Sequence, residues 1–169
     1  MKNLFSTSIG KKFAMAISAI FLMIFLLQHF IINITSVFSE DIFNMLSHFM
    51  GTNFLVQFIL QPILIAGVLF HFIMGFYLEI QNRKAAKYEY QKEKGSANST
   101  WMSRNMITSG LVILAFLVLH FIDFWVPEMN HKYIEFLPED PNRYFKHLVH
   151  KFENPLRVAM YCLAFVLLA

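Results

Sequence analysis

Charged residues are scarce in this chain. Lysine, arginine, aspartate and glutamate make up 15% of its 169 residues, whereas a soluble domain carries about a quarter. Hydrophobic residues make up 57%, and phenylalanine alone occurs 20 times. A soluble fold of this size could not bury so much apolar surface, but a lipid bilayer can solvate it. The net charge is only +3, and the basic residues cluster at the ends of apolar runs, which indicates membrane orientation and no nucleic acid partner.

Cysteine is almost absent as well. The single cysteine, Cys162, excludes an intrachain disulfide and any metal cluster held by cysteines alone. It lies in an apolar run, where its expected role is packing.

Four apolar runs are long enough, or nearly long enough, to cross a bilayer, which takes about 20 mostly apolar residues. They cover residues 13–34, 54–80, 106–126 and 155–169. The first run has no small-residue cleavage pattern after it, so we expect a retained helix and not a signal peptide. Pro62 is tolerable inside the second run, Pro127 is predicted to end the third, and Pro155 suits a helix start. The runs predict an all-α transmembrane helix bundle that forms one domain, residues 1–169.

The fourth run is still apolar at Ala169, where the chain stops. Its 15 residues from Pro155 are too few to span a membrane, and no glycine, proline or basic last turn precedes the end. A protein that ends on a short helix is one interpretation. We favour the other, in which the fourth helix continues beyond residue 169.

The connections between the runs differ in their basic residues. Lys2, Lys11 and Lys12 precede the first run, and no lysine or arginine lies between the first two. The connection between the second and third runs holds Arg83, Lys84, Lys87, Lys92, Lys94 and Arg104. Basic connections stay on the cytoplasmic side. We therefore expect the N-terminus and residues 81–105 in the cytoplasm, where residues 81–100 could bind a soluble partner.

Three of the seven histidines lie inside the first three runs: His29, His71 and His120. An ionisable side chain inside a span is costly and is a functional candidate. A lone one could be a hydrogen bonder between helices, but three in successive helices weaken that interpretation. A zinc site is disfavoured because the three lie at two depths. A proton relay remains an alternative, since histidine titrates near neutrality.

The depths of these histidines suggest a pair. His29 lies 17 residues beyond Lys12 and His120 lies 16 residues beyond Arg104, so both are ~25 Å from the inner surface. His71 lies on a helix of opposite direction and falls near the inner face. Imidazole is a common axial ligand of haem iron, and two histidines per iron suit electron transfer. His29 and His120 are thus a candidate haem pair, and the partner of His71 would fall at about residue 171. No cysteine–histidine attachment motif occurs, so such a haem would be noncovalent.

Several segments together resemble a known family. They are Gly10–Lys12, Leu26–Asn33, Phe43–Met50, Gln81–Ala85 and Ser103–Met106. In order and in histidine position they are similar to the cytochrome b membrane anchor of succinate:quinone oxidoreductases, of the single-subunit, five-helix, two-haem type found in Bacteroidetes-like bacteria. The similarity covers nearly the whole chain, although each segment alone is weak.

The resemblance implies a protein of the bacterial cytoplasmic membrane that binds two haem b groups. His29 and His120 would ligate the outer haem, and His71 the inner one with a ligand beyond residue 169; a fifth helix would follow. A flavoprotein and an iron–sulfur subunit would bind on the cytoplasmic side, and electrons would pass between them and menaquinone. The chain would do no succinate chemistry itself. The whole complex could form a higher oligomer.

Other site residues are less specific. The family suggests a quinone pocket near the outer haem that Asn33, His48 and Asp123 could face. Haem propionates or the iron–sulfur partner could contact a set of basic residues, each of which could instead be an interfacial anchor: Lys11, Lys12, Arg83, Lys84 and Arg104. The alternatives are a cytochrome b anchor of a hydrogenase or formate dehydrogenase, and a haem-free transporter or proton channel with relay histidines.

Overall fold

The computed structural model of the chain describes residues 7–85 and 105–168, and all secondary structure in these ranges is helical. The chain divides into two compact units, residues 1–89 and 90–169. Three helical segments are long and apolar enough to cross a membrane, Ile9–Phe38, Val56–Lys84 and Met106–Ile134, and Pro155–Leu167 is a shorter apolar helix. The predicted all-α transmembrane helix bundle is confirmed, and the chain is a multi-pass membrane protein.

The first unit contains helix α1 (Ser8–Phe38), helix α2 (Glu40–Thr52), the π-helical turn η2 (Val56–Leu60) and helix α3 (Gln61–Ala85). Helix α1 extends beyond the predicted 13–34 at both ends: the Thr7 side chain caps its start, and its last turn closes with the Ser39 backbone amide, which donates to the Thr35 carbonyl. The Thr7 hydroxyl accepts a hydrogen bond from the Gly10 amide at 3.0 Å. At the other end Ser39 begins α2, where its hydroxyl accepts from the Ile42 amide at 3.3 Å.

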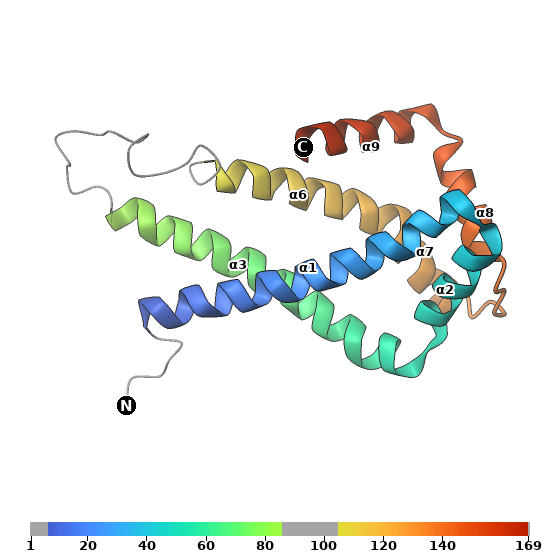
Figure 1. Cartoon of the computed structure of the whole chain (residues 1–169), viewed down its shortest axis with the longest axis horizontal. Helices are drawn as coiled ribbons and strands as arrows, with labels where there is room; N and C mark the ends of the chain where they lie inside the picture. The colour runs from blue at the N-terminus through green and yellow to red at the C-terminus, as the bar shows by residue number, and fades with distance from the viewer. Residues whose placement is uncertain (1–6, 86–104, 169) are drawn as a thin grey trace. The chain divides into compact units, whose positions relative to one another are not determined.

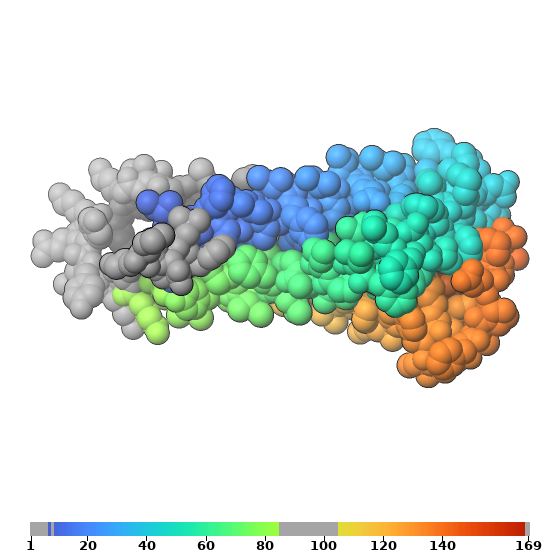
Figure 2. Space-filling view, turned by 90° about the horizontal axis from the view of Figure 1, so that it is seen from below, coloured from blue at the N-terminus to red at the C-terminus, as the bar shows by residue number. Residues whose placement is uncertain are grey.

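Helices α1 and α3 cross each other and pack together there (Figure 1), and the space-filling view shows them side by side (Figure 2). Two glycines of α3 face α1. A Cβ on Gly67 would stand 3.0 Å from the Phe21 ring, and one on Gly75 would stand 3.8 Å from the Met15 methyl. Small residues at a helix interface let two backbones approach closely inside a membrane. The missing side chain at Gly67 thus lets the Phe21 ring of α1 lie close to the α3 backbone.

The second unit contains helix α6 (Met106–His120), the π turn η3 (Phe121–Trp125), helix α7 (Val126–Met129), the π turn η4 (Asn130–Ile134), helix α8 (Arg143–Phe152) and helix α9 (Pro155–Leu168). Helix α9 packs on α6 and follows α8 (Figure 1). Asn154 caps α9: its side-chain oxygen accepts from the Leu156 amide at 2.9 Å. The predicted helix start at Pro155 is confirmed.

The prediction that Pro127 ends the third span is wrong. Helical structure continues through α7 and η4 to Ile134. The π turn η3 ends just before it, and the Val126 amide donates to the Phe121 carbonyl five residues earlier. The same arrangement precedes Pro62, where the Gln61 amide donates to the Val56 carbonyl. Widening the helix one turn before a proline accommodates a residue that cannot donate a backbone hydrogen bond.

Two connections between the apolar runs also contain helices that the runs did not predict, α2 and α8. Helix α8 alternates its residue types with helical period: Phe145, Leu148 and Phe152 share one side, whereas His147 and Lys151 share the other. The polar side of this amphipathic helix faces Asp123 of η3, which His147 and Lys151 contact. The amphipathic pattern of α8 can be read in the sequence, but its 10 residues are too few for a membrane span.

Two glycines provide a matched test of the packing. Gly110 lies in α6 with no described atom within 4 Å of a built Cβ, whereas Gly67 meets Phe21 at 3.0 Å. We expect Gly110→Ala to stabilise the protein by about 0.5–1 kcal/mol, because alanine loses less backbone entropy in a helix. Gly67→Ala should gain less or destabilise, because the Phe21 ring must move. Thermal unfolding of both variants in the same detergent measures the difference; equal stabilisation would contradict the close approach at Gly67.

Candidate functional site

His71 lies in the middle of α3, on the side that faces α1. Its Nδ1 is 2.9 Å from the Ser18 hydroxyl of α1, and Ser18 is buried. The Ser18 hydroxyl also donates to the Met15 carbonyl at 2.8 Å. His71 therefore has a polar partner on a neighbouring helix, which holds the imidazole in one orientation.

His29 and His120 have similar aromatic surroundings. The His29 ring stacks on Phe25 with centroids 5.6 Å apart, and the His120 ring stacks on Phe116 with centroids 6.0 Å apart. In both cases the phenylalanine lies four residues earlier, one helical turn away. Both histidines are half-buried.

The sequence itself contains this common pattern. Residues 25–30 read FLLQHF and residues 116–121 read FLVLHF. His29 belongs to the first unit and His120 to the second, and their pairing at one haem stays a prediction. The shared local environment is consistent with a shared role.

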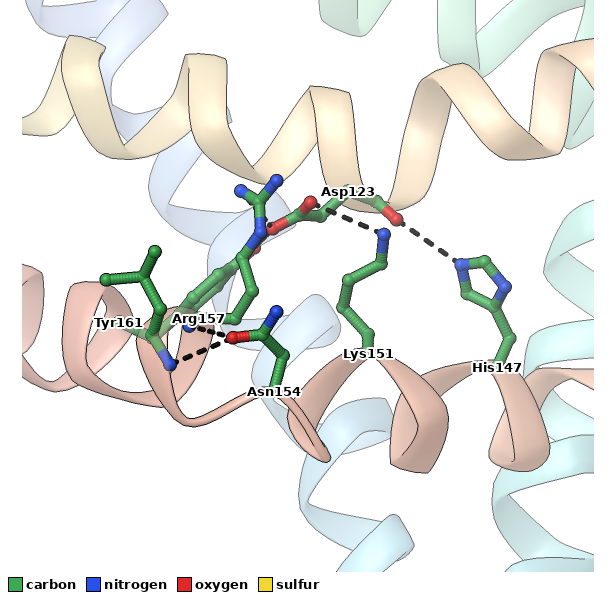
Figure 3. Close-up of polar contacts among 7 residues, drawn as sticks. Asp123, His147, Lys151, Asn154, Arg157 and Tyr161 are labelled. Atoms are coloured by element: carbon green, nitrogen blue, oxygen red, sulfur yellow. Dashed lines mark hydrogen bonds and ion pairs between the residues drawn. The ribbon is translucent and has the colours of Figure 1, made fainter.

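Asp123 is the most deeply buried charged residue among those described, with an exposed fraction of 0%. It lies in η3, one turn after His120, and is surrounded by residues of α8 and α9 (Figure 3). Its carboxylate is 3.5 Å from Lys151 Nζ and 3.3 Å from an Arg157 guanidinium nitrogen. The Tyr161 hydroxyl donates to the same carboxylate at 3.3 Å. Two cations and one hydroxyl thus compensate one buried carboxylate.

The backbone of Asp123 is contacted as well. Pro127, four residues later, has no amide hydrogen to donate to the Asp123 carbonyl. His147 Nε2 of α8 lies 3.3 Å from that oxygen (Figure 3). Because a carbonyl only accepts, the hydrogen resides on Nε2. Helix α8 thus supplies a donor at the place where the helix of the third span lacks one.

A second ionic group ties α7 to α8. Glu128 pairs with Lys132 and with Arg143. The Arg143 guanidinium also lies over the Tyr144 ring, 4.4 Å from its centroid. Burial raises the pKa of the Tyr144 phenol, and the neighbouring Glu128 charge raises it further. The phenol therefore stays neutral at physiological pH.

The other two predicted quinone residues, Asn33 and His48, each contact a residue of their own helix. The Asn33 amide donates to the His29 carbonyl at 2.8 Å on its own helix. His48 is half-buried on α2, and its carbonyl accepts from the Thr52 hydroxyl at 2.8 Å. Both lie in the first unit and Asp123 lies in the second, so a common quinone pocket stays a prediction.

The basic residues predicted to contact haem propionates or the iron–sulfur partner differ in their exposure and in their partners. Lys11 Nζ donates to the Tyr77 hydroxyl at 3.2 Å and lies over the same ring, which ties α1 to α3. Lys12 and Lys84 are exposed. Arg83 pairs with Glu79 at 2.7 Å on the surface. Arg104 lies outside the described residues.

Comparison of the chain with protein-family models, with curated proteins and with solved structures finds no match.

Proposed function

We propose that this chain is the dihaem cytochrome b membrane subunit of a succinate:quinone oxidoreductase, that is, a succinate dehydrogenase or fumarate reductase. One observation carries the proposal. Each of three candidate spans holds a histidine in its apolar part, namely His29, His71 and His120, and the third span holds a further one, His131, near its end. His29 and His120 lie in matching Phe-x-x-x-His turns. Histidines placed this way in apolar helices are expensive unless they bind something, and the family resemblance supplies haem as the ligand.

The residues fit noncovalent haem. Haem b, when bound, accepts and donates one electron at a time. His29 and His120 would supply axial nitrogens for the outer haem, and His71 would supply one for the inner haem. Phenylalanine rings stack on His29 and on His120, which gives these two imidazoles an apolar neighbour of the kind that a noncovalent haem packs against. Pairs of histidines leave no open position on the iron, which favours electron transfer over binding of small molecules.

The subunit would join two reactions without performing the first. Succinate or fumarate reacts at the flavoprotein subunit, and the iron–sulfur subunit passes electrons to or from this chain on the cytoplasmic face of the bacterial membrane. Menaquinone would react on the other side of the membrane, near His29 and His120, the residues proposed to hold the outer haem. Asn33, His48 and Asp123 are the proposed quinone contacts, and Lys11, Lys12, Arg83 and Lys84 are proposed contacts of propionates or of the iron–sulfur partner.

The electron donor of the purified complex tests this function. We expect succinate to reduce a b-type absorbance band, and menaquinol with fumarate to drive the reverse reaction. A band reduced by hydrogen or by formate, but not by succinate, would assign the chain to a hydrogenase or formate dehydrogenase instead. A colourless protein after haem-replete expression would leave the transporter or proton-channel alternative.

A further inference from the structure

We infer that Ser18 is a positioning residue for His71: its hydroxyl fixes the ring tautomer and orientation that leave Nε2 ready to bind the inner haem iron. The inference rests on the proposed function and adds to it a residue that the family resemblance does not assign. It is carried by one chain of hydrogen bonds within the first unit, from His71 through Ser18 to the Met15 carbonyl.

The number of available hydrogens decides which group donates in each of these two hydrogen bonds. A serine hydroxyl has a single hydrogen. Ser18 directs it to the Met15 carbonyl at 2.8 Å, which can only accept. Toward His71, 2.9 Å away, the Ser18 oxygen can therefore act only as an acceptor. With the serine hydrogen assigned to the Met15 carbonyl, the hydrogen of the neutral imidazole resides on Nδ1.

The tautomer has a direct consequence for metal binding. A neutral imidazole with its hydrogen on Nδ1 keeps the lone pair on Nε2, which is the nitrogen free to ligate a metal. Metal-binding histidines commonly donate their other ring hydrogen to an acceptor, which fixes the ring and makes the ligating nitrogen more basic. Ser18 would perform this role for His71.

The packing of α1 on α3 explains how a short side chain reaches the ring. Gly67 and Gly75 lie one turn before and one turn after His71, on the same side of α3. Their positions approach Phe21 and Met15 of α1, which flank Ser18 in the sequence. The absence of side chains above and below His71 brings the two backbones together at Ser18.

Ser18→Ala in the full complex tests the inference. With no acceptor for its Nδ1 hydrogen, His71 becomes a weaker donor to oxidised iron. We expect the midpoint potential of the inner haem to rise and haem affinity at that site to fall about 10-fold or more. Redox titration measures the potential, and electron paramagnetic resonance of the oxidised haems reports the ring orientation. His71→Ala, which removes the inner signals, identifies which haem is inner.

Two further variants separate positioning from packing. Ser18→Thr keeps a hydroxyl and should retain the wild-type potential and spectrum. Ser36→Ala removes another hydroxyl of α1 that donates to a carbonyl three residues earlier, at Asn33, and should leave the inner haem unchanged. The inference is overturned if Ser18→Ala keeps wild-type inner-haem properties, or if Ser36→Ala shifts them equally. Wild-type complex without haem would overturn the proposed function and this inference together, whereas haem with an unresponsive inner site overturns the inference alone.

Discussion

Replacing His29 or His120 by alanine should remove the outer haem and about half of the reduced b-type absorbance of the purified complex. Each iron with two axial histidines loses one of its two protein ligands, and noncovalent haem has no other bond to the protein. The remaining absorbance should belong to the inner haem. His71→Ala should remove that other half. Haem content per complex, measured by extraction, and the reduced-minus-oxidised spectrum give the result.

The double variant His29→Ala/His120→Ala decides whether these histidines share one iron. If they do, the double variant loses no more haem than either single variant, because residues that act as one unit are not additive. If they bind different haems, the losses add and no b-type band remains in the double variant. His150→Ala is the control: this histidine is exposed on α8 and pairs with Glu153, so its removal should leave haem content unchanged. A full complement of haem in both single variants would contradict the proposed ligation.

The apolar runs predicted the number and approximate place of the long helices because bilayer thickness sets the length of a span. They did not predict the ends. Helix α1 continues through Thr35 and Ser36 to Phe38 and ends at Ser39, whose side chain caps the next helix. The third span continues past Pro127 because a π turn adjusts the hydrogen bonds before it. A proline alone does not reveal such a turn in the sequence.

The predicted histidines could be recognised from the sequence because each is an ionisable residue in an apolar run. The residues that contact these histidines could not be recognised from the sequence. Ser18 and His71 are separated by 53 residues, and Asp123 and Arg157 by 34. Only the packing of α1 on α3, and of α8 and α9 on the third span, brings these pairs together. Asp123 was predicted from its position near the outer surface, but its two cationic partners were not.

Asp123→Ala should destabilise the protein by about 3–5 kcal/mol, the effect expected when one partner of a buried ion pair is removed. The carboxylate is fully buried and contacts Lys151, Arg157 and Tyr161. Without it, two cations remain close together with no counter-charge, and α8 and α9 lose their polar attachment to η3. Thermal unfolding of the purified complex should show a midpoint lower by several degrees.

Two comparisons identify the cause of that loss. Glu79→Ala removes the acid of a surface pair whose arginine, Arg83, is 72% exposed, and it should cost no more than about 1 kcal/mol. Adding Arg157→Leu to Asp123→Ala should restore part of the lost stability, because one of the two uncompensated cations is then absent. The quinone contact proposed for Asp123 would add a separate effect, altered menaquinol kinetics, which the unfolding midpoint does not report. An Asp123→Ala variant as stable as Glu79→Ala would therefore contradict the structural role of the buried ion pairs.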